Sequence, residues 1–302
     1  MLSILIPTYN YNIVQLVNAI HKQATKSNVE FEIIALDDVS NADTIKQNFE
    51  INILKNTQYI LSKTNGGIAV NRQLLCDKAK FDWILLLDAD MKLKSTHFIS
   101  NYIEALKLNF EVIFGGINYE SKVPDSESLL RWKYGVNCET IDAKKRNKTP
   151  YKITSAANMF IKKDIYKRFG LDSIGNSYGM DIFFGPQLKL NKIPVLHINN
   201  EVFHLGLESS KIYLKKTRLA AETLLNLYDT KKIKLHENDL LKTFISLKKL
   251  GLNYIFSLFF KLFKDLMTKK LLSKSPSIKI LQLYKLSYMC NFDFKKGSNQ
   301  TD

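Results

Sequence analysis

The sequence predicts an α/β protein with a mostly parallel central sheet flanked by helices, followed by a helical C-terminal region. Strand and helix patterns alternate through residues 1–115 and return over 153–206, as in sheets built from strand–helix–strand units. Several strand candidates are continuous apolar runs, which is typical of strands buried on both faces. From about Ser209 onward only helical patterns occur. We therefore expect two domains, residues 1–208 and residues 209–302.

The individual elements follow from apolar spacing and from turn residues. The predicted strands are Leu2–Ile6, Phe31–Leu36, Gln58–Leu61, Trp83–Leu87 and Val112–Phe114. The predicted helices are Asn12–Gln23, Thr44–Phe49, Ile68–Ala79 and Phe98–Leu108. Residues 118–152 form a long polar excursion, and long ordered loops in compact domains are usually functional.

Composition sets limits on the class of protein. The chain has 302 residues, 45% of them hydrophobic, which suffices for a large core with an appendage. Cys76, Cys138 and Cys290 lack metal-ligand spacing and indicate a reducing compartment without a disulfide framework. The apolar stretch after Met1 is too short for a secretory signal and is followed by Pro7. We expect a cytoplasmic protein.

The net charge of +15 is concentrated at the C-terminal end. Residues 210–302 contain 19 Lys and Arg against 7 Asp and Glu, whereas residues 1–209 contain 25 against 22. Localised basic charge marks a surface for an anionic partner. No helix-turn-helix, zinc-finger or RNA-binding signature is present, so nucleic acid is not expected.

The basic residues are interleaved with large apolar ones over Leu240–Met267. This segment is too short and too interrupted to span a bilayer, and it resembles a basic amphipathic helix of the membrane interface. We expect peripheral attachment to the inner face of the cell membrane. The alternative is that these helices pack on the catalytic domain and expose a lysine face.

Two carboxylates follow the most apolar strand, in Asp88-Ala89-Asp90. In open α/β sheets, ligands bind beyond the carboxyl ends of the strands. Paired carboxylates repel each other unless a cation or a donor-rich ligand is bound, and hard oxygen ligands suit magnesium or manganese with phosphate co-ligands. The alternative is a strand followed by an Asp-capped turn.

Five further motifs accompany this one, in a fixed order along the first 206 residues. They are Ile6-Pro7-Thr8-Tyr9-Asn10, Asp37-Asp38-Val39-Ser40, Asn65-Gly66-Gly67 continuing to Arg72, Gly179-Met180-Asp181, and Phe203-His204-Leu205-Gly206. Together the six motifs resemble family-2 glycosyltransferases, which have the Rossmann-like, nucleotide-sugar-binding GT-A fold. The resemblance implies inverting transfer of a sugar from a nucleotide-diphosphate sugar to a hydroxyl of a glycan or lipid-linked saccharide.

The resemblance also implies a donor site, with a UDP-sugar favoured. Its positions are Pro7, Thr8, Tyr9, Asp38, Asn65, Gly67, Arg72 and Asp88. An aromatic ring and a hydroxyl after the first strand can hold a base and ribose, and a glycine loop lets the backbone approach phosphates. A carboxylate can accept a base imide N–H, and arginine pairs with a diphosphate. The alternatives are a proline turn, an aspartate N-cap and a solvated arginine.

The implied catalytic residues are a metal pair and a base. Asp90 and His204 correspond to the ligands of Mn²⁺ or Mg²⁺, while His197 is assigned to the core. His204 has the alternative of a hydrogen-bonded core histidine. Asp181 corresponds to the general base, with Met180 where the family has glutamate. That departure motivates an alternative function, a catalytically inactive nucleotide-binding module docked to a membrane assembly.

A third hypothesis is a nucleotidyltransferase acting on sugar phosphates, although no basic glycine-rich N-terminal loop supports it. On the acceptor side, we expect an exposed Trp132 to face a sugar, with a loop anchor as the alternative. Asn158 begins a strand that we expect to lead toward the same site.

Overall fold

The structure is a computed structural model that describes the chain except for residues 170–178, 180, 234–235 and 299–302. The chain divides into two compact units. The first comprises Met1–Glu120, Thr140–Asn176 and Asn191–Gly206, and the second comprises Ser121–Glu139, Ser177–Leu190 and Leu207–Asp302. The second unit thus includes two earlier segments besides the C-terminal residues, and the predicted boundary at residues 208 and 209 stays a prediction.

The first unit is built on a seven-stranded sheet with the order β3-β2-β1-β4-β8-β6-β9. Its strands are β1 (Leu2–Thr8), β2 (Phe31–Asp37), β3 (Thr57–Leu61), β4 (Trp83–Leu87), β6 (Val112–Phe114), β8 (Asn158–Lys162) and β9 (Val195–His197). Only β8 runs antiparallel to its neighbours β4 and β6, and the other pairs are parallel. The predicted mostly parallel sheet is confirmed.

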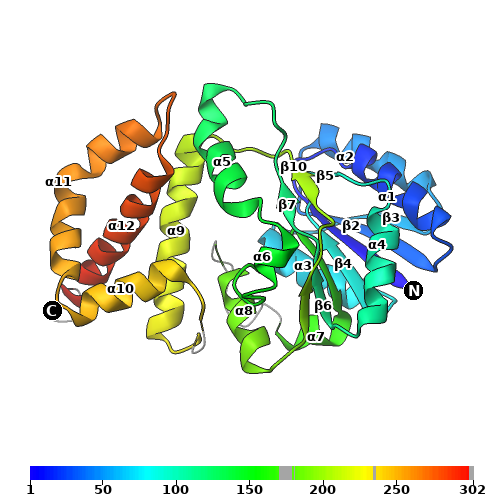
Figure 1. The fold of residues 1–302 in the computed structure, drawn as a ribbon. Coiled ribbons are helices and arrows are strands. Elements are labelled where there is room, and N and C mark those ends of the chain that lie inside the picture. Colours follow the sequence, from blue (N-terminus) through cyan, green and yellow to red (C-terminus); the bar gives the residue numbers. More distant parts are fainter. Residues whose placement is uncertain (170–178, 180, 234–235, 299–302) are drawn as a thin grey trace. The chain divides into compact units, whose positions relative to one another are not determined.

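Helices cover both faces of this sheet. Helices α1 (Val14–Lys26) and α4 (Phe98–Ala105) contact each other (Figure 1). Their apolar sides pack on one face of the sheet, to which Ile4 and Ile6 of β1 contribute. Leu5 lies outside that cluster, because successive strand residues point to opposite faces. Helix α3 (Gly67–Lys78) contacts β1, β2 and α7 (Lys163–Arg168) on the opposite side. Two short helices complete the unit, α2 (Ala42–Asn48) and α6 (Ala143–Arg146).

A second, three-stranded sheet begins directly after the Asp-Ala-Asp motif. It contains β5 (Met91–Leu93), β10 (Val202–His204) and β7 (Ile117–Asn118). Strand β10 lies between the other two, antiparallel to β5 and parallel to β7. This small sheet joins three segments that are far apart in the sequence.

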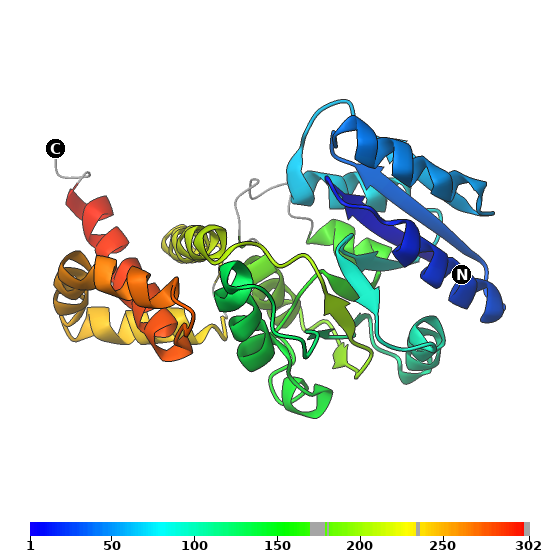
Figure 2. The same ribbon diagram turned by 90° about the horizontal axis from the view of Figure 1, so that it is seen from above.

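The second unit is helical over its described residues. Its helices are α5 (Leu129–Tyr134), α8 (Asp181–Leu190), α9 (Ser210–Asp229), α10 (Asp239–Lys249), α11 (Asn253–Leu271) and α12 (Ile278–Ser298). Figure 2 shows α11 in orange and α12 in red side by side, and the two helices share buried residues such as Phe260, Leu271 and Tyr284. The prediction of a helical C-terminal region is confirmed.

One prediction for this region is wrong: Leu240–Met267 is not a single helix. The helix is interrupted between α10 and α11, where Gly251 has φ +70°. This left-handed conformation favours glycine and ends helices. Within the described residues, no helix is both long enough and apolar enough to cross a membrane.

Candidate functional site

The predicted donor residues gather at one edge of the main sheet because their strands are parallel. In the β1–β2 register Thr8 pairs with Asp37, and in the β2–β3 register Asp37 pairs with Leu61. The carboxyl ends of β3, β2, β1 and β4 therefore lie at a common edge, where ligands of open α/β sheets bind. Tyr9, Asp38 and Asp88 each come directly after one of these strands, and Tyr9 is exposed there.

Asp37 is a structural residue. Its carboxylate accepts hydrogen bonds from the Ser40 amide at 2.7 Å, the Ser40 hydroxyl at 2.6 Å and the Tyr59 hydroxyl at 2.6 Å. It is completely buried. Burial and the hydrogen bond to Asp37 raise the pKa of Tyr59, so the tyrosine stays protonated and keeps donating. The alternative of an aspartate N-cap is wrong, because the N-cap of α2 is Asn41, whose side chain accepts a hydrogen bond from the Thr44 amide.

Asp38 instead fixes the glycine loop. Its two carboxylate oxygens accept the amide N–H groups of Gly66 at 2.8 Å and Gly67 at 2.9 Å, and its backbone carbonyl accepts the Asn65 side-chain amide at 2.9 Å. Gly66 and Gly67 begin helix α3, whose N-terminal amides favour negative charge. Asp38 thereby joins the end of β2 to the predicted phosphate loop. Val39, the residue that follows Asp38, has φ +66°, a strained conformation for a β-branched residue.

Arg72 and Asp88 form an ion pair rather than two separate contact points. The Arg72 Nη2 atom donates to Asp88 Oδ1 at 2.7 Å, and the arginine side chain is 4% exposed against 26% for the aspartate. The alternative of a solvated arginine is wrong, because α3 turns Arg72 into the protein. The Asp88 side chain, which follows β4 at the sheet edge, thus stays partly exposed while the guanidinium holds it.

The metal-ligand candidates Asp90 and His204 are brought together. His204 Nε2 lies 3.0 Å from Asp90 Oδ2, and both side chains are only partly exposed. In the small sheet His204 pairs with Met91, and the Leu205 amide donates to the Asp90 carbonyl at 2.9 Å. The strand register therefore decides this juxtaposition.

Three further residues around this pair carry no predicted role. The Tyr119 hydroxyl lies 3.2 Å from His204 Nδ1, and Tyr119 is buried. A Cβ atom on Gly206 would lie 2.0 Å from Asp90 Oδ2, so only glycine fits beside the carboxylate. Burial and, to a smaller extent, the negative charge of Asp90 raise the pKa of Tyr11. Gly206 is the last residue of the Phe203-His204-Leu205-Gly206 motif, whereas no local sequence pattern marks Tyr119 or Tyr11.

The donor set fits a divalent ion only in part. If Nδ1 of His204 carries the proton and donates to Tyr119, Nε2 turns its lone pair toward Asp90, and a nitrogen and an oxygen ligand face each other. Among the described residues no group of three His, Cys, Asp or Glu side chains could hold a metal. An ion here would therefore take further ligands from phosphate and water, as Mg²⁺ and Mn²⁺ commonly do.

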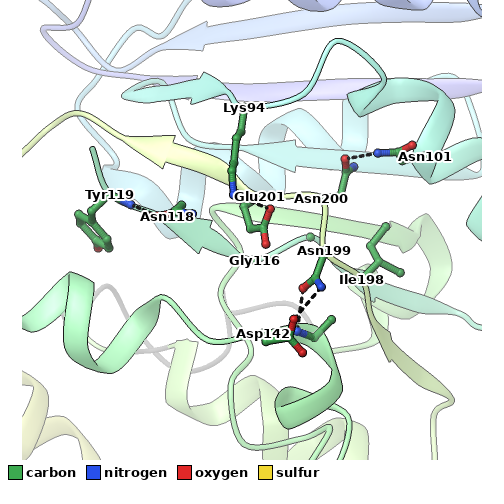
Figure 3. Close-up of polar contacts among 12 residues, drawn as sticks. Lys94, Asn101, Gly116, Asn118, Tyr119, Asp142, Ile198, Asn199, Asn200 and Glu201 are labelled. Atoms are coloured by element: carbon green, nitrogen blue, oxygen red, sulfur yellow. Dashed lines mark hydrogen bonds and ion pairs between the residues drawn. The ribbon is translucent and has the colours of Figure 1, made fainter. Parts of the chain in front are cut away.

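Strand β10 is held by the segment that precedes it (Figure 3). Asn199 donates to Asp142 at 2.8 Å, Asn200 accepts from Asn101 at 2.9 Å, and Glu201 pairs with Lys94 at 3.4 Å. These three consecutive residues thus bind three different segments. The connection fixes where β10, and with it His204, enters the small sheet.

His197 is a core residue, as expected. Arg146 Nη1 donates to His197 Nδ1 at 2.8 Å, and Nε2 faces the Pro150 carbonyl at 2.8 Å. Because arginine only donates, Nδ1 must accept and Nε2 carries the proton. Burial, with a smaller contribution from Arg146, lowers the pKa of His197 to about 4. The basic run of the polar excursion therefore contributes a buried arginine.

The two acceptor-side expectations hold only in part: strand β8 does begin at Asn158, opposite Leu87 at the end of β4, but neither side chain has the expected role. Asn158 is buried, and its side chain bonds Tyr102, the Gly116 carbonyl and the Asn200 carbonyl, so it supports the core. Trp132 is half-buried rather than exposed. Asp181 begins α8 in the second unit, but its side chain and Met180 lie outside the described residues. Its role as the base stays a prediction.

Comparison with known proteins decides the family. The sequence model of the protein family described as glycosyl transferase family 2 matches residues 3–170, more than half of the chain. The chain belongs to glycosyl transferase family 2. The predicted family is confirmed, and with it the assignment as a glycosyltransferase. No curated protein matches the sequence.

Several solved structures share the fold at low identity. Residues 1–349 of S. aureus TarS align with a TM-score of 0.52 and 17% identity, over 98% of this chain and 91% of that chain. The same fragment in complex with UDP-GlcNAc gives 0.52 and 17%, over 98% and 92%. The mannosyltransferase PcManGT from Pyrobaculum calidifontis, in complex with GDP-Man and Mn2+, gives 0.57 and 9%, over 97% and 86%. These likenesses confirm the GT-A fold of this family-2 enzyme.

Proposed function

We propose that this family-2 enzyme transfers a sugar from a nucleotide-diphosphate sugar to a hydroxyl group of a glycan or lipid-linked saccharide, with inversion and with the help of Mn²⁺ or Mg²⁺. The observation that carries the proposal is the Asp90–His204 pair, 3.0 Å apart. Asp90 follows Asp88 by two residues, directly after the sheet edge where ligands of this fold class bind, and β10 brings His204 to it. The bound forms of the similar structures support a nucleotide-sugar donor and a divalent ion.

The donor would be held by groups of the sheet edge. Tyr9, exposed at this edge, would stack on the base, and the start of α3, which Asp38 joins to the end of β2, would let the backbone approach the diphosphate. We place Asp88 on a ribose hydroxyl. Since Arg72 Nη2 is engaged by Asp88, the arginine in this proposal orients Asp88 and adds positive potential for the diphosphate.

In the reaction, the acceptor oxygen bonds to the anomeric carbon as the bond from that carbon to the diphosphate oxygen breaks. Asp181 would take the hydroxyl proton, which requires it to reach the acceptor oxygen at roughly 2.6–3.2 Å. A divalent ion on Asp90 and His204 would neutralise charge on the departing diphosphate. The side chain of Arg72 adds to the same electrostatic stabilisation.

We also propose that the donor is a UDP-sugar, and thermal stabilisation tests this preference. We expect UDP-sugars to raise the melting temperature more than GDP-sugars or ADP-sugars, and more with Mn²⁺ than with EDTA, because a ligand that binds only the folded state stabilises it. Stabilisation by GDP-sugars alone would replace the uridine assignment.

The transfer reaction is tested with wild type, Asp90→Ala and Asp181→Ala, using each stabilising donor and an acceptor extract. We expect wild type to release the nucleoside diphosphate and both variants to lose most of that activity while still folding. Full activity in both variants would contradict the mechanism. Nucleotide binding without any turnover by wild type would favour the inactive binding module instead.

A further inference from the structure

The second unit carries an apolar surface that the proposed reaction does not use. Helix α11 has large apolar side chains exposed at Ile255, Leu258, Leu262 and Leu266. These positions are three or four residues apart and so lie on one side of the helix. We call these four residues the α11 stripe. Leu250, Leu252 and Tyr254, exposed just before it, continue the apolar surface toward the break at Gly251.

The α11 stripe is not part of the core of the second unit. The opposite side of α11 is buried, and its residues Phe260, Met267 and Leu271 form a core with α12. Helix α11 is thus apolar on two sides, one packed and one exposed. Its 19 residues correspond to a length of about 28 Å. Exposed apolar surface of this extent is uncommon unless it binds something.

The charges beside the stripe indicate the partner. Near the stripe, helix α11 has exposed lysines at 261, 269 and 270, and Asp265 is its one acidic residue. Lys264 is also exposed, but it lies two residues from Leu262 and Leu266 and therefore on the other side of the helix. A second copy docking through the same face would bring lysines against lysines, since an interface of two identical patches repeats every charge. An anionic lipid surface supplies both the apolar phase and the opposite charge.

We propose that α11 docks this enzyme on an anionic bilayer, lying in the plane of the membrane with the α11 stripe inserted and the lysines at the lipid phosphates. The orientation follows from length and polarity, because no described helix can cross a membrane. The expected membrane surface over Leu240–Met267 is thereby narrowed to one side of α11. The proposal does not depend on the sugar-transfer reaction.

Vesicle co-sedimentation of the full chain tests the stripe. We expect binding to vesicles of equimolar phosphatidylcholine and phosphatidylglycerol, and weak binding to phosphatidylcholine alone. In L262Q/L266Q, where both leucines are 68% and 66% exposed, we expect the partition constant to fall at least about tenfold. The matched control is I53Q/L108Q in the first unit, where the residues are 86% and 57% exposed, and it should bind like wild type.

The lysines are tested with the same vesicles. Changing Lys261, Lys269 and Lys270 to glutamine should weaken binding on the order of thirtyfold, since each lysine near an anionic surface contributes several-fold. The same change at three exposed lysines of the first unit, Lys22, Lys26 and Lys46, should have little effect. High salt should weaken the binding of wild type.

Three results would overturn the proposal: no binding to the anionic vesicles, equal losses in the α11 variants and their controls, or unchanged binding by L262Q/L266Q. A dimer in solution that L262Q/L266Q dissociates, without vesicle binding, would assign the stripe to a second copy. All readings are taken without donor sugar, so failure here leaves the proposed transfer reaction untouched. Circular dichroism of each variant confirms that it is folded.

Discussion

The imidazole Nε2 of His204 lies 3.0 Å from Oδ2 of Asp90, although the two residues are 114 positions apart in the sequence. Their meeting depends on the pairing of β10 with β5, in which His204 lies opposite Met91. The Tyr119 hydroxyl stands at the other nitrogen of the ring. Tyrosine, histidine and carboxylate thus form a chain that can fix the tautomer and the orientation of His204.

We expect Tyr119→Phe to weaken the apparent affinity for Mn²⁺ about tenfold, because the partner that orients the imidazole is lost. His204→Ala should weaken it further, since a ligand itself is removed. The measurement is sugar transfer titrated with Mn²⁺. Tyr102→Phe is the control, as its hydroxyl bonds Asn158 in the core. Equal Mn²⁺ dependence in Tyr119→Phe and Tyr102→Phe would show that Tyr119 has only a structural role.

Gly206→Ala should abolish most transfer activity in a protein that still folds. The added Cβ atom would lie 2.0 Å from Asp90 Oδ2, so the carboxylate or strand β10 must shift. Gly251→Ala is the comparison, because no atom lies within 4 Å of its Cβ position, although its φ is +70°. That variant should lose about 1 kcal/mol of unfolding free energy and keep its activity. Activity and chemical denaturation are measured on both.

We expect substitution of Asp37 to lower mainly the stability of the protein, and substitution of its neighbour Asp38 to lower mainly the affinity for the donor. Asp37→Asn disturbs three hydrogen bonds of a fully buried carboxylate and should cost about 2 kcal/mol of unfolding free energy. Asp38→Asn places an amide donor against the Gly66 and Gly67 amides and should release the loop. Calorimetric titration with UDP should therefore show the greater loss of affinity in Asp38→Asn. The reverse order would assign the donor contact to Asp37.

Unfolding free energy should fall as the pH is lowered through the range set by His197. The folded protein holds the pKa of His197 at about 4, below the ordinary value of 6.5. Between those values the unfolded chain binds more protons, so stability rises with pH and is fully present only above about pH 6.5. Linkage gives a loss of about 2 kcal/mol between about pH 7 and about pH 5.

The measurement for His197 is urea denaturation of wild type and His197→Gln at both pH values. The variant is less stable throughout, because Arg146 loses its partner nitrogen, but its pH dependence should be shallower by the same amount. Parallel pH dependences would show that another group is responsible.

Local patterns were enough to predict most of the sheet and the residues at its edge. Apolar runs identified the strands β1, β2 and β4, and Asp38 and Asp88 follow such runs directly. The physical reason is that parallel strands all present their carboxyl ends at one edge, so a residue's place after a strand already locates it. The helical C-terminal region was equally readable from its spacing, except for the break that the left-handed Gly251 imposes.

What the sequence by itself determined, then, is the family, the sheet and the set of polar groups at its edge. Only the tertiary structure decided which of them pair: Arg72 with Asp88, Asp38 with the glycine loop, and Asp90 with His204. Such pairs depend on strand register and helix rotation, which are set by the packing of the whole core. For the same reason Arg146, one of three consecutive basic residues, became a buried partner of His197 while Lys144 and Lys145 stayed exposed.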